Sequence, residues 1–450
     1  MNDKIDNNAL QQAAEIALQQ AKKQGASAAE VGVNQTKGLS VTVRQGEVET
    51  LEYNNDKGLG ITVYFDQSKA SASTSDMRPE AIYDAVKSAC DIAKHTQEDD
   101  CAGLADADLM ATEFADLSLY HPWDLDAERA IAIASECEQA GLEFDPKITN
   151  SEGGSLSSHQ SGYIYANSHG FTGQTTSSRH SLVCTLIADD KQGMQRNYWY
   201  DMARDAADMK SAYYIGQRAA ENTVSRLNSK TIKTGNYPVI FAADIAPSLF
   251  GKFISAIRGS ALYRQSSFLL DHLGKQIFPE FIHIHEQPYL LKGLGSATFD
   301  GEGVATKTRD LVTDGILQSY VLDSYSARKL KMETTGNAGG VHNLTIDRGD
   351  LDFKALLKEM DTGIVITETM GMGVNILTGD YSQGAAGFWV EKGEIQYPID
   401  EFTIASNLRE MFMGIQAIGN DIDLRGSTRT GSVWIDNMMV AGGNNISDIS

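Results

Sequence analysis

The chain has 450 residues, of which 42% are hydrophobic and 22% charged, so it can bury the cores of two or three globular domains. Its 60 acidic residues outnumber the 38 basic ones and give a formal net charge of −22. A surface with that charge repels phosphate backbones, which argues against nucleic-acid binding.

The expected compartment follows from what the sequence lacks. The N-terminal segment contains no apolar stretch typical of a signal peptide, and no apolar run reaches the roughly 18 residues that would span a bilayer. Cys90, Cys101, Cys137 and Cys184 are widely spaced and form no CxxC pair, so we interpret them as reduced thiols. We therefore expect a cytoplasmic protein without membrane contact.

Residues 1–116 predict a first α/β unit. Apolar residues at helical spacing indicate a helix over 8–24, and alternating apolar residues around turns at 45–46 and 56–58 indicate a β-meander. A second helix is expected over 79–94. The pattern is that of a compact helix–meander–helix unit.

A second unit of the same kind is expected over 117–233. The acidic, irregular segment 96–123 leads into it and is expected to be a linker that wraps a surface. Its acidic residues lack the spacing of a calcium loop, so we interpret them as solvated. A helix over 126–140 is followed by a flexible Gly/Ser turn at 151–162. A second meander and a closing helix then occupy 163–227.

Residues 234–450 predict a β-rich C-terminal domain. Its first stretch, 235–260, indicates a buried strand, a turn and a helix, with Asp244 as N-cap and Pro247 in the first helical turn. Further helices are expected at 319–330, 353–360 and 407–418, among strands separated by Gly-containing turns. With helix-flanked antiparallel sheets in the N-terminal half, the expected fold class is α+β. The sequence shows no internal repeat.

Four dispersed stretches carry a family resemblance: GLGITVYF at 58–65, NSHGF at 167–171, YPVIFAADIAPSLF at 237–250 and GNDI at 419–422. With them the chain resembles the TldD/PmbA family of metalloproteases, and its PmbA (TldE) branch in particular. The resemblance implies a heteromer in which a TldD-type subunit holds zinc and the pair cleaves peptides and unfolded protein segments. It also implies that the isolated chain could form a homodimer.

In the TldD branch, the helix after this strand carries HExxxH, whose two His bind zinc and whose Glu is the general base. Alignment of the preceding apolar residues places Gly251 and Ala256 at the His positions and Lys252 at the Glu position. Glycine and alanine have no donor atom, and an ammonium repels a metal cation. The resemblance therefore implies a chain with no catalytic residues and no metal cofactor of its own.

One local pattern offers an alternative metal site. In FIHIHEQ, His283 and His285 lie on one face of an expected strand with Glu286 beside them, and two His at this spacing can chelate a metal. We favour a partly exposed edge strand instead, because the sequence places no third ligand. His272 and His342 would contribute only if the fold brought them close.

Two Gly-rich loops are the remaining candidates for a site. The run 371–387 lacks the order of a GxGxxG phosphate loop, so turns and bulges explain it better; in the family this region lines a peptide cleft. For the loop 334–343, a place at a cleft or partner interface and a surface turn both stay open. Ser324, Ser326 and Arg328 are better explained by a helix N-terminus than by a nucleophilic site.

Three functions therefore remain. The chain is expected to be a non-catalytic subunit that shapes a chamber and holds unfolded substrate. The alternatives are an autonomous metallopeptidase that uses His283, His285 and Glu286, and a peptide-binding scaffold without a proteolytic role.

Overall fold

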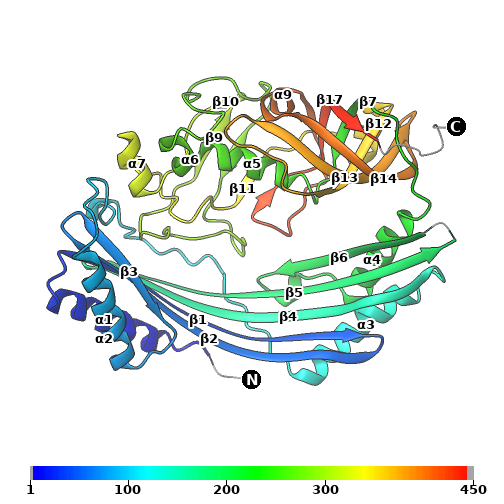
Figure 1. The fold of residues 1–450 in the computed structure, drawn as a ribbon. Helices are drawn as coiled ribbons and strands as arrows, with labels where there is room; N and C mark the ends of the chain where they lie inside the picture. Colours follow the sequence, from blue (N-terminus) through cyan, green and yellow to red (C-terminus); the bar gives the residue numbers. More distant parts are fainter. Residues whose placement is uncertain (1–3, 192, 443–450) are drawn as a thin grey trace.

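The computed structural model describes residues 4–191 and 193–442, and within these ranges no helix has the length and apolar character needed to cross a bilayer. A long curved sheet with its helices forms an N-terminal body, and a β-rich C-terminal body lies above the sheet (Figure 1). The expected α+β class, with helix-flanked antiparallel strands first and a β-rich domain second, is confirmed.

The N-terminal body contains one antiparallel sheet of six strands, ordered β3-β2-β1-β4-β5-β6. The strands are β1 (Ala28–Arg44), β2 (Glu47–Phe65), β3 (Ser68–Thr74), β4 (Ile148–Asn167), β5 (Thr172–Asp190) and β6 (Gly193–Ala203). The helices are α1 (Asn7–Lys23), α2 (Pro79–Ala93), α3 (Ala127–Leu142) and α4 (Ala212–Ser225). Because β1 pairs with β4, the sheet continues across the boundary that we placed after residue 116.

Alternation along the strands gives the sheet one face that packs against helices. Val33, Leu39 and Val41 of β1 point toward the helices and are at most 5% exposed. One core lies between the sheet and α1 and α2, and a second lies between the sheet and α3 and α4. The opposite face is turned toward the C-terminal body (Figure 1).

Two predicted turns of the N-terminal half are wrong, because each lies inside a strand. Residues 56–58 belong to β2 and pair with β1. Residues 151–162 belong to β4, which pairs with β1 on one side and β5 on the other. The glycines of β4 allow close packing there, since a Cβ on Gly154 would lie 2.3 Å from the carbonyl oxygen of Ala134 in α3.

The structure contains a repeat that the sequence does not show. Each half of the N-terminal body runs helix, three strands, helix, and β1 and β4 lie side by side at the centre of the sheet. What the halves share is apolar alternation on the helix side rather than residue identity. The matching buried positions are Leu59, Ile61 and Val63 of β2 and Leu182, Cys184 and Leu186 of β5.

The C-terminal body contains a six-stranded mixed sheet, ordered β14-β13-β12-β7-β17-β15, and a five-stranded sheet, ordered β10-β9-β8-β11-β16. The strands are β7 (Gly235–Phe241), β8 (Ile284–Glu286), β9 (Arg309–Thr313), β10 (Ile316–Leu317), β11 (Leu344–Ile346), β12 (Gly363–Met370), β13 (Asp380–Glu391), β14 (Glu394–Asn407), β15 (Ile415–Ile418), β16 (Thr428–Arg429) and β17 (Val433–Ala441). The helices are α5 (Pro247–Ile257), α6 (Gly259–Tyr263), α7 (Ser324–Leu330), α8 (Phe353–Met360) and α9 (Leu408–Met413). One large apolar core connects the two sheets with α5.

The stretch 235–260 forms the predicted strand and helix, β7 and α5, but its predicted cap is wrong. The helix begins at Pro247, and no side chain caps it, because Ala246 occupies the N-cap position. Asp244 lies in the turn before the helix. The predicted helix over 407–418 is also shorter, since α9 ends at Met413 and the chain continues as β15.

The acidic segment 96–123 is irregular apart from one short 3-10 turn, as expected of a linker. It is fixed to the C-terminal body through α7. Tyr325 Oη and Lys329 Nζ donate to the Asp99 carboxylate at 2.7 and 2.8 Å. The guanidinium of Arg328 donates to backbone carbonyl oxygens of the segment. The negative charge of Asp99 is therefore paired by side chains of α7.

Candidate functional site

A cleft of about 1460 Å³ lies between the two bodies. One wall consists of β6 and α4, and the other consists of the turn before α5, the strand β12 and the loop 421–426. The lining combines aromatic side chains with charges of both signs. A cleft of this kind offers a ligand apolar contacts and ion pairs along the same path.

Arg425 packs against two aromatic residues of β6 within this lining. The guanidinium of Arg425 lies 3.9 Å from the ring centroid of Trp199 and 4.5 Å from that of Tyr200. It also donates to the Asp423 carboxylate at 2.6 Å and to the Tyr200 carbonyl oxygen at 3.1 Å. Burial raises the pKa of the Tyr200 hydroxyl. These contacts connect the loop 421–426 to the aromatic residues of β6.

A second arginine connects the two walls. Arg226, which follows α4, forms an ion pair with Glu368 of β12 and lies 3.6 Å from the Asp400 carboxylate of β14. Its side chain is 9% exposed, so the charge is paired where little water reaches it. The N-terminal wall of the cleft is thereby fixed to the main sheet of the C-terminal body.

Asp244 has a different environment from the one that the sequence predicts. It lines the cleft instead of capping α5, and the residue is exposed there. Desolvation raises the pKa of its carboxyl, and the nearby Arg425 partly offsets this. Asp244 is therefore an acidic group suited to contact a cationic part of a ligand.

The three positions that align with HExxxH lie on α5 beyond the cleft lining. Gly251 is exposed, and a Cβ built on it would meet no atom within 4 Å. Lys252 is half-buried, whereas Ala256 is completely buried in the core. Residues five apart in a helix differ in direction by about 140°. The donor set does not fit zinc, because two positions have no donor atom and the third carries an ammonium.

The alternative metal residues do not converge on one point. His283 and His285 lie on one face, whereas Glu286 is buried on the other side of β8. His285 contacts Asp310 through Nδ1 at 2.6 Å and Asp347 through Nε2 at 2.9 Å. Burial lowers the pKa of His285, but these two hydrogen bonds outweigh it and raise the pKa overall. Both ring nitrogens of His285 are therefore engaged by carboxylates of neighbouring segments, and neither is directed at His283 or Glu286.

The strand that carries these residues is not an edge strand, so that part of our interpretation is wrong. β8 lies in the middle of its sheet, between β9 and β11. Its buried side faces a polar network rather than the solvent. Within residues 4–191 and 193–442, no group of three or more His, Cys, Asp or Glu side chains has the geometry to hold a metal ion.

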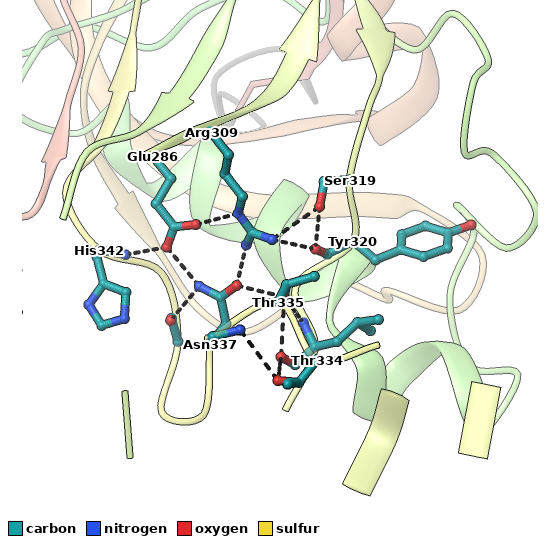
Figure 2. Close-up of polar contacts among 11 residues, drawn as sticks. Glu286, Arg309, Ser319, Tyr320, Thr334, Thr335, Asn337 and His342 are labelled. Carbon is teal, nitrogen blue, oxygen red and sulfur yellow. Dashed lines mark hydrogen bonds and ion pairs between the residues drawn. The ribbon is translucent and has the colours of Figure 1, made fainter. Parts of the chain in front are cut away.

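Glu286 is the centre of that polar network, which Figure 2 shows. Its carboxylate accepts from Arg309 Nε at 2.7 Å, and from Asn337 Nδ2 and the His342 backbone N–H at 2.7 Å each. Thr335 Oγ1 donates to the Asn337 side chain at 2.7 Å. The Gly-rich loop 334–343 is therefore anchored in the interior and is not a simple surface turn. The fold brings His342 to Glu286, but the contact is made by the His342 backbone N–H and not by its imidazole.

Sequence reasoning missed the aromatic wall of the cleft. Tyr198, Trp199 and Tyr200 are consecutive in β6, and a strand directs neighbouring side chains to opposite faces. At least one of the three must therefore point away from the core, which was a usable signal. The partner Arg425 is more than 200 residues away in sequence, so only the tertiary structure could identify it.

Family models match most of the chain. They are described as PmbA/TldA metallopeptidase domain 1 (residues 29–93), the central domain (120–227) and the C-terminal domain (234–442). The first two matches fall on the two halves of the N-terminal body, and the third falls on the C-terminal body.

Full-length relatives agree with these matches. Metalloprotease PmbA of Escherichia coli O157:H7 is 48% identical over 433 residues, which cover 96% of each chain. The solved structure of a Bacteroides thetaiotaomicron protein, described as a candidate modulator of DNA gyrase, has a TM-score of 0.92 at 28% identity and covers 98% of this chain and 100% of that one. TldE from Thermococcus kodakarensis shares the fold with a TM-score of 0.81 at 20% identity, covering 96% and 100%. The chain therefore belongs to the PmbA (TldE) branch of the PmbA/TldD metallopeptidase family.

Proposed function

We propose that this chain is the non-catalytic subunit of a TldD/TldE-type zinc metalloprotease that processes peptides and unfolded protein segments. The observation that carries the proposal is α5, a well-packed helix of a metallopeptidase fold that has Gly251, Lys252 and Ala256 at the aligned HExxxH positions. The zinc and its general base then belong to a TldD-type partner. We place the assembly in the cytoplasm, where the four free cysteines would stay reduced.

The role of this chain in the assembly is to hold substrate. The cleft between its two bodies has aromatic side chains beside charges of both signs. An unfolded segment presents apolar and charged side chains in no fixed order, and such a lining can contact either kind. Asp244 adds a carboxylate to this lining, beside Arg425, whose charge Asp423 already pairs. The chain thereby confines an extended segment next to the partner's zinc.

Of the two alternatives, one has support from a specific observation. The cleft alone would also suit a peptide-binding scaffold without a proteolytic role. No observation favours an autonomous site at His283, His285 and Glu286, because Arg309 already neutralises Glu286 on the opposite side of β8 from the two imidazoles.

The decisive experiment measures metal content and peptidase activity together. The purified chain, its TldD-type partner and their mixture are analysed for zinc and assayed on an unfolded protein. We expect no stoichiometric zinc and no cleavage for the chain alone, and one zinc per pair with full activity for the mixture. Zinc-dependent cleavage by the chain alone would disprove the proposal. Equal activity of the partner with and without this chain would favour the scaffold.

Matched substitutions identify which subunit supplies the catalytic base. Replacement of the Glu in the partner's HExxxH by Gln should abolish cleavage by the mixture, because a carboxamide cannot accept the proton of zinc-bound water. The aligned substitution in this chain, Lys252→Gln, should leave cleavage within about twofold of the wild-type rate, because in this proposal the partner supplies the catalytic base. A twofold change in rate corresponds to less than about 1 kcal/mol.

A further inference from the structure

The first half of β2 is an uncovered strand edge. β3 pairs only with residues Leu59–Phe65, and among the described residues no other strand pairs with 47–57 on the side away from β1. In Figure 1 this part of β2 follows the lower rim of the sheet. Every second residue of such an edge directs its backbone N–H and C=O outward, where another strand can pair with them.

Apolar side chains lie along this edge. Val48, Leu51 and Tyr53 are 46%, 42% and 52% exposed. Across the ladder they pair with Val43, Val41 and Leu39 of β1, which are buried in the core beneath α3. The three side chains therefore extend an apolar face beyond the flank of α3, and about half of each stays accessible to solvent.

The internal repeat supplies a comparison within the same molecule. Leu59 of β2 corresponds to Leu182 of β5 in the repeat. The same offset in residue number makes Leu51 correspond to Gln174 and Tyr53 to Thr176. The second half thus has polar side chains where the first half has apolar ones.

The corresponding edge of β5 is covered by the chain itself. The Ser178 backbone N–H donates to the Leu119 carbonyl oxygen at 2.9 Å, and the His121 N–H donates to Ser178 Oγ at 2.7 Å. An extended segment therefore occupies one edge of the repeat, while the other edge is apolar and open.

The charges of the open edge restrict its occupant. Glu47, Glu49, Glu52 and Asp56 lie along it, with Lys57 at its end. A second copy would bring the same acidic strand on a chain that also carries a net charge of −22, which disfavours self-pairing. Arg44 already pairs with Glu49, at 3.4 Å. A strand with apolar residues on one face and Lys or Arg near Glu52 has no such penalty.

We propose that residues 47–57 of β2 pair with an extended, basic strand of the TldD-type subunit, which packs apolar side chains on Leu51 and Tyr53. The identity of this partner rests on the function proposed above, whereas the location of the contact rests on the open edge. The partner strand occupies the edge of β2 that corresponds, in the repeat, to the edge of β5 covered by the segment around Leu119.

Binding of the full-length chain to the TldD-type subunit, measured by titration calorimetry, tests the proposal. We expect Leu51→Lys and Tyr53→Lys to weaken binding by at least about tenfold, because each places a charge on the central apolar contact and repels a basic strand. The matched controls Gln174→Lys and Thr176→Lys change the equivalent positions of β5 and should stay within about twofold of wild type. Circular dichroism shows whether all four variants remain folded.

Each other outcome has a distinct meaning. Wild-type affinity of both β2 variants would overturn the proposed contact and leave the proposed heteromer intact. A wild-type chain that does not bind the TldD-type subunit would overturn both proposals. An isolated chain that dimerises, and that Leu51→Lys converts to a monomer, would show that a second copy occupies the edge and would refute the assignment.

Discussion

Glu286 and Arg309 form a buried ion pair whose members also hold the loop 334–343 in place. Their side chains are 2% and 16% exposed, so neither charge can be hydrated well if the other is removed. Asn337 contacts both members of the pair, Glu286 through Nδ2 and Arg309 through Oδ1. At the scale of single residues, a one-atom change in this network is therefore expected to be costly.

Substitution of Glu286 by Gln should destabilise the C-terminal body by about 3 kcal/mol, because it leaves the Arg309 charge buried without a counter-ion. The matched control is Glu152→Gln, which removes a carboxylate from an ion pair with Arg196 whose side chains are 43% and 55% exposed. Its expected cost is below about 1 kcal/mol. Scanning calorimetry would measure both, and equal melting temperatures of the two variants would contradict the prediction.

Glu302 predicts a pH dependence of stability. Burial raises its pKa from 4.5 to about 7, although the hydrogen bond from the Ser324 backbone N–H favours the charged form. Between these two pH values the folded chain binds more protons than the unfolded one. The contribution of Glu302 to the free energy of unfolding is therefore complete below pH 4.5 and is lost as the pH rises through about 7. The Ser324 N–H donates to Glu302 Oε2 at 2.9 Å, and a Gln oxygen can accept the same bond.

Substitution Glu302→Gln should therefore raise the melting temperature relative to wild type at about pH 8 and leave it nearly unchanged at about pH 5, where both side chains are neutral in the folded state. The gain at the higher pH is on the order of 3 kcal/mol, since each unit of the rise from 4.5 to about 7 corresponds to about 1.4 kcal/mol. Glu359→Gln, on the exposed side of α8, is the control and should show no pH-dependent difference. A constant difference for Glu302→Gln at both pH values would disagree with this account.

At the scale of elements, glycines in β4 decide how closely α3 approaches the sheet. A Cβ on Gly154 would meet the Ala134 carbonyl oxygen at 2.3 Å, and that oxygen belongs to the helix backbone and cannot move away by itself. Gly60 in β2 is the opposite case, since a Cβ there would meet nothing within 4 Å. Both residues lie in long strands of the same sheet.

Substitution Gly154→Ala is expected to destabilise the N-terminal body by about 1–3 kcal/mol, because α3 must shift away from β4. Gly60→Ala should be neutral or stabilising by about 0.5 kcal/mol, since alanine loses less backbone entropy than glycine. Thermal unfolding of the two variants beside wild type measures the contrast. A stabilising Gly154→Ala would mean that the helix and strand pack more loosely than the structure indicates.

At the scale of the whole molecule, α7 joins the two bodies by holding the segment that leaves the first unit. Arg328 donates to the carbonyl oxygens of Cys101, Gly103 and Leu104, with distances of 3.3 and 3.2 Å for the first two and 2.5 Å for the third. Backbone acceptors in an irregular segment have few other partners, so the arginine orders the segment.

Loss of this side chain in Arg328→Ala should increase hydrogen exchange in residues 99–106 by about tenfold or more, because several charge-assisted hydrogen bonds are lost together. Exchange in β1 and β4 should not change. The control is Arg264→Ala, an exposed arginine after α6 that contacts the ring of Tyr263. Unchanged exchange in the segment would show that Asp99 and its partners suffice to hold it.

The sequence by itself determined the elements with strong periodicity and the features that depend on residue type. Helices α1, α2, α3 and α4 follow from apolar residues at helical spacing, because an amphipathic face needs no distant partner to be recognised. The lack of donor atoms at Gly251 and Ala256 is a property of the residues alone. The family resemblance, carried by local stretches such as 237–250, was likewise readable from the chain.

Only the tertiary structure decided what depends on partners distant in sequence. Residues 56–58 and 151–162 have the composition of turns, yet strands on either side supply the hydrogen bonds that make them sheet. Strand alternation alone places Glu286 opposite His285, but only the fold brings Arg309 to neutralise it and Asn337 to donate a hydrogen bond to it in the interior. The cleft and the open edge of β2 arise from how the sheet is assembled, and local sequence patterns contain no record of which edge remains unpaired.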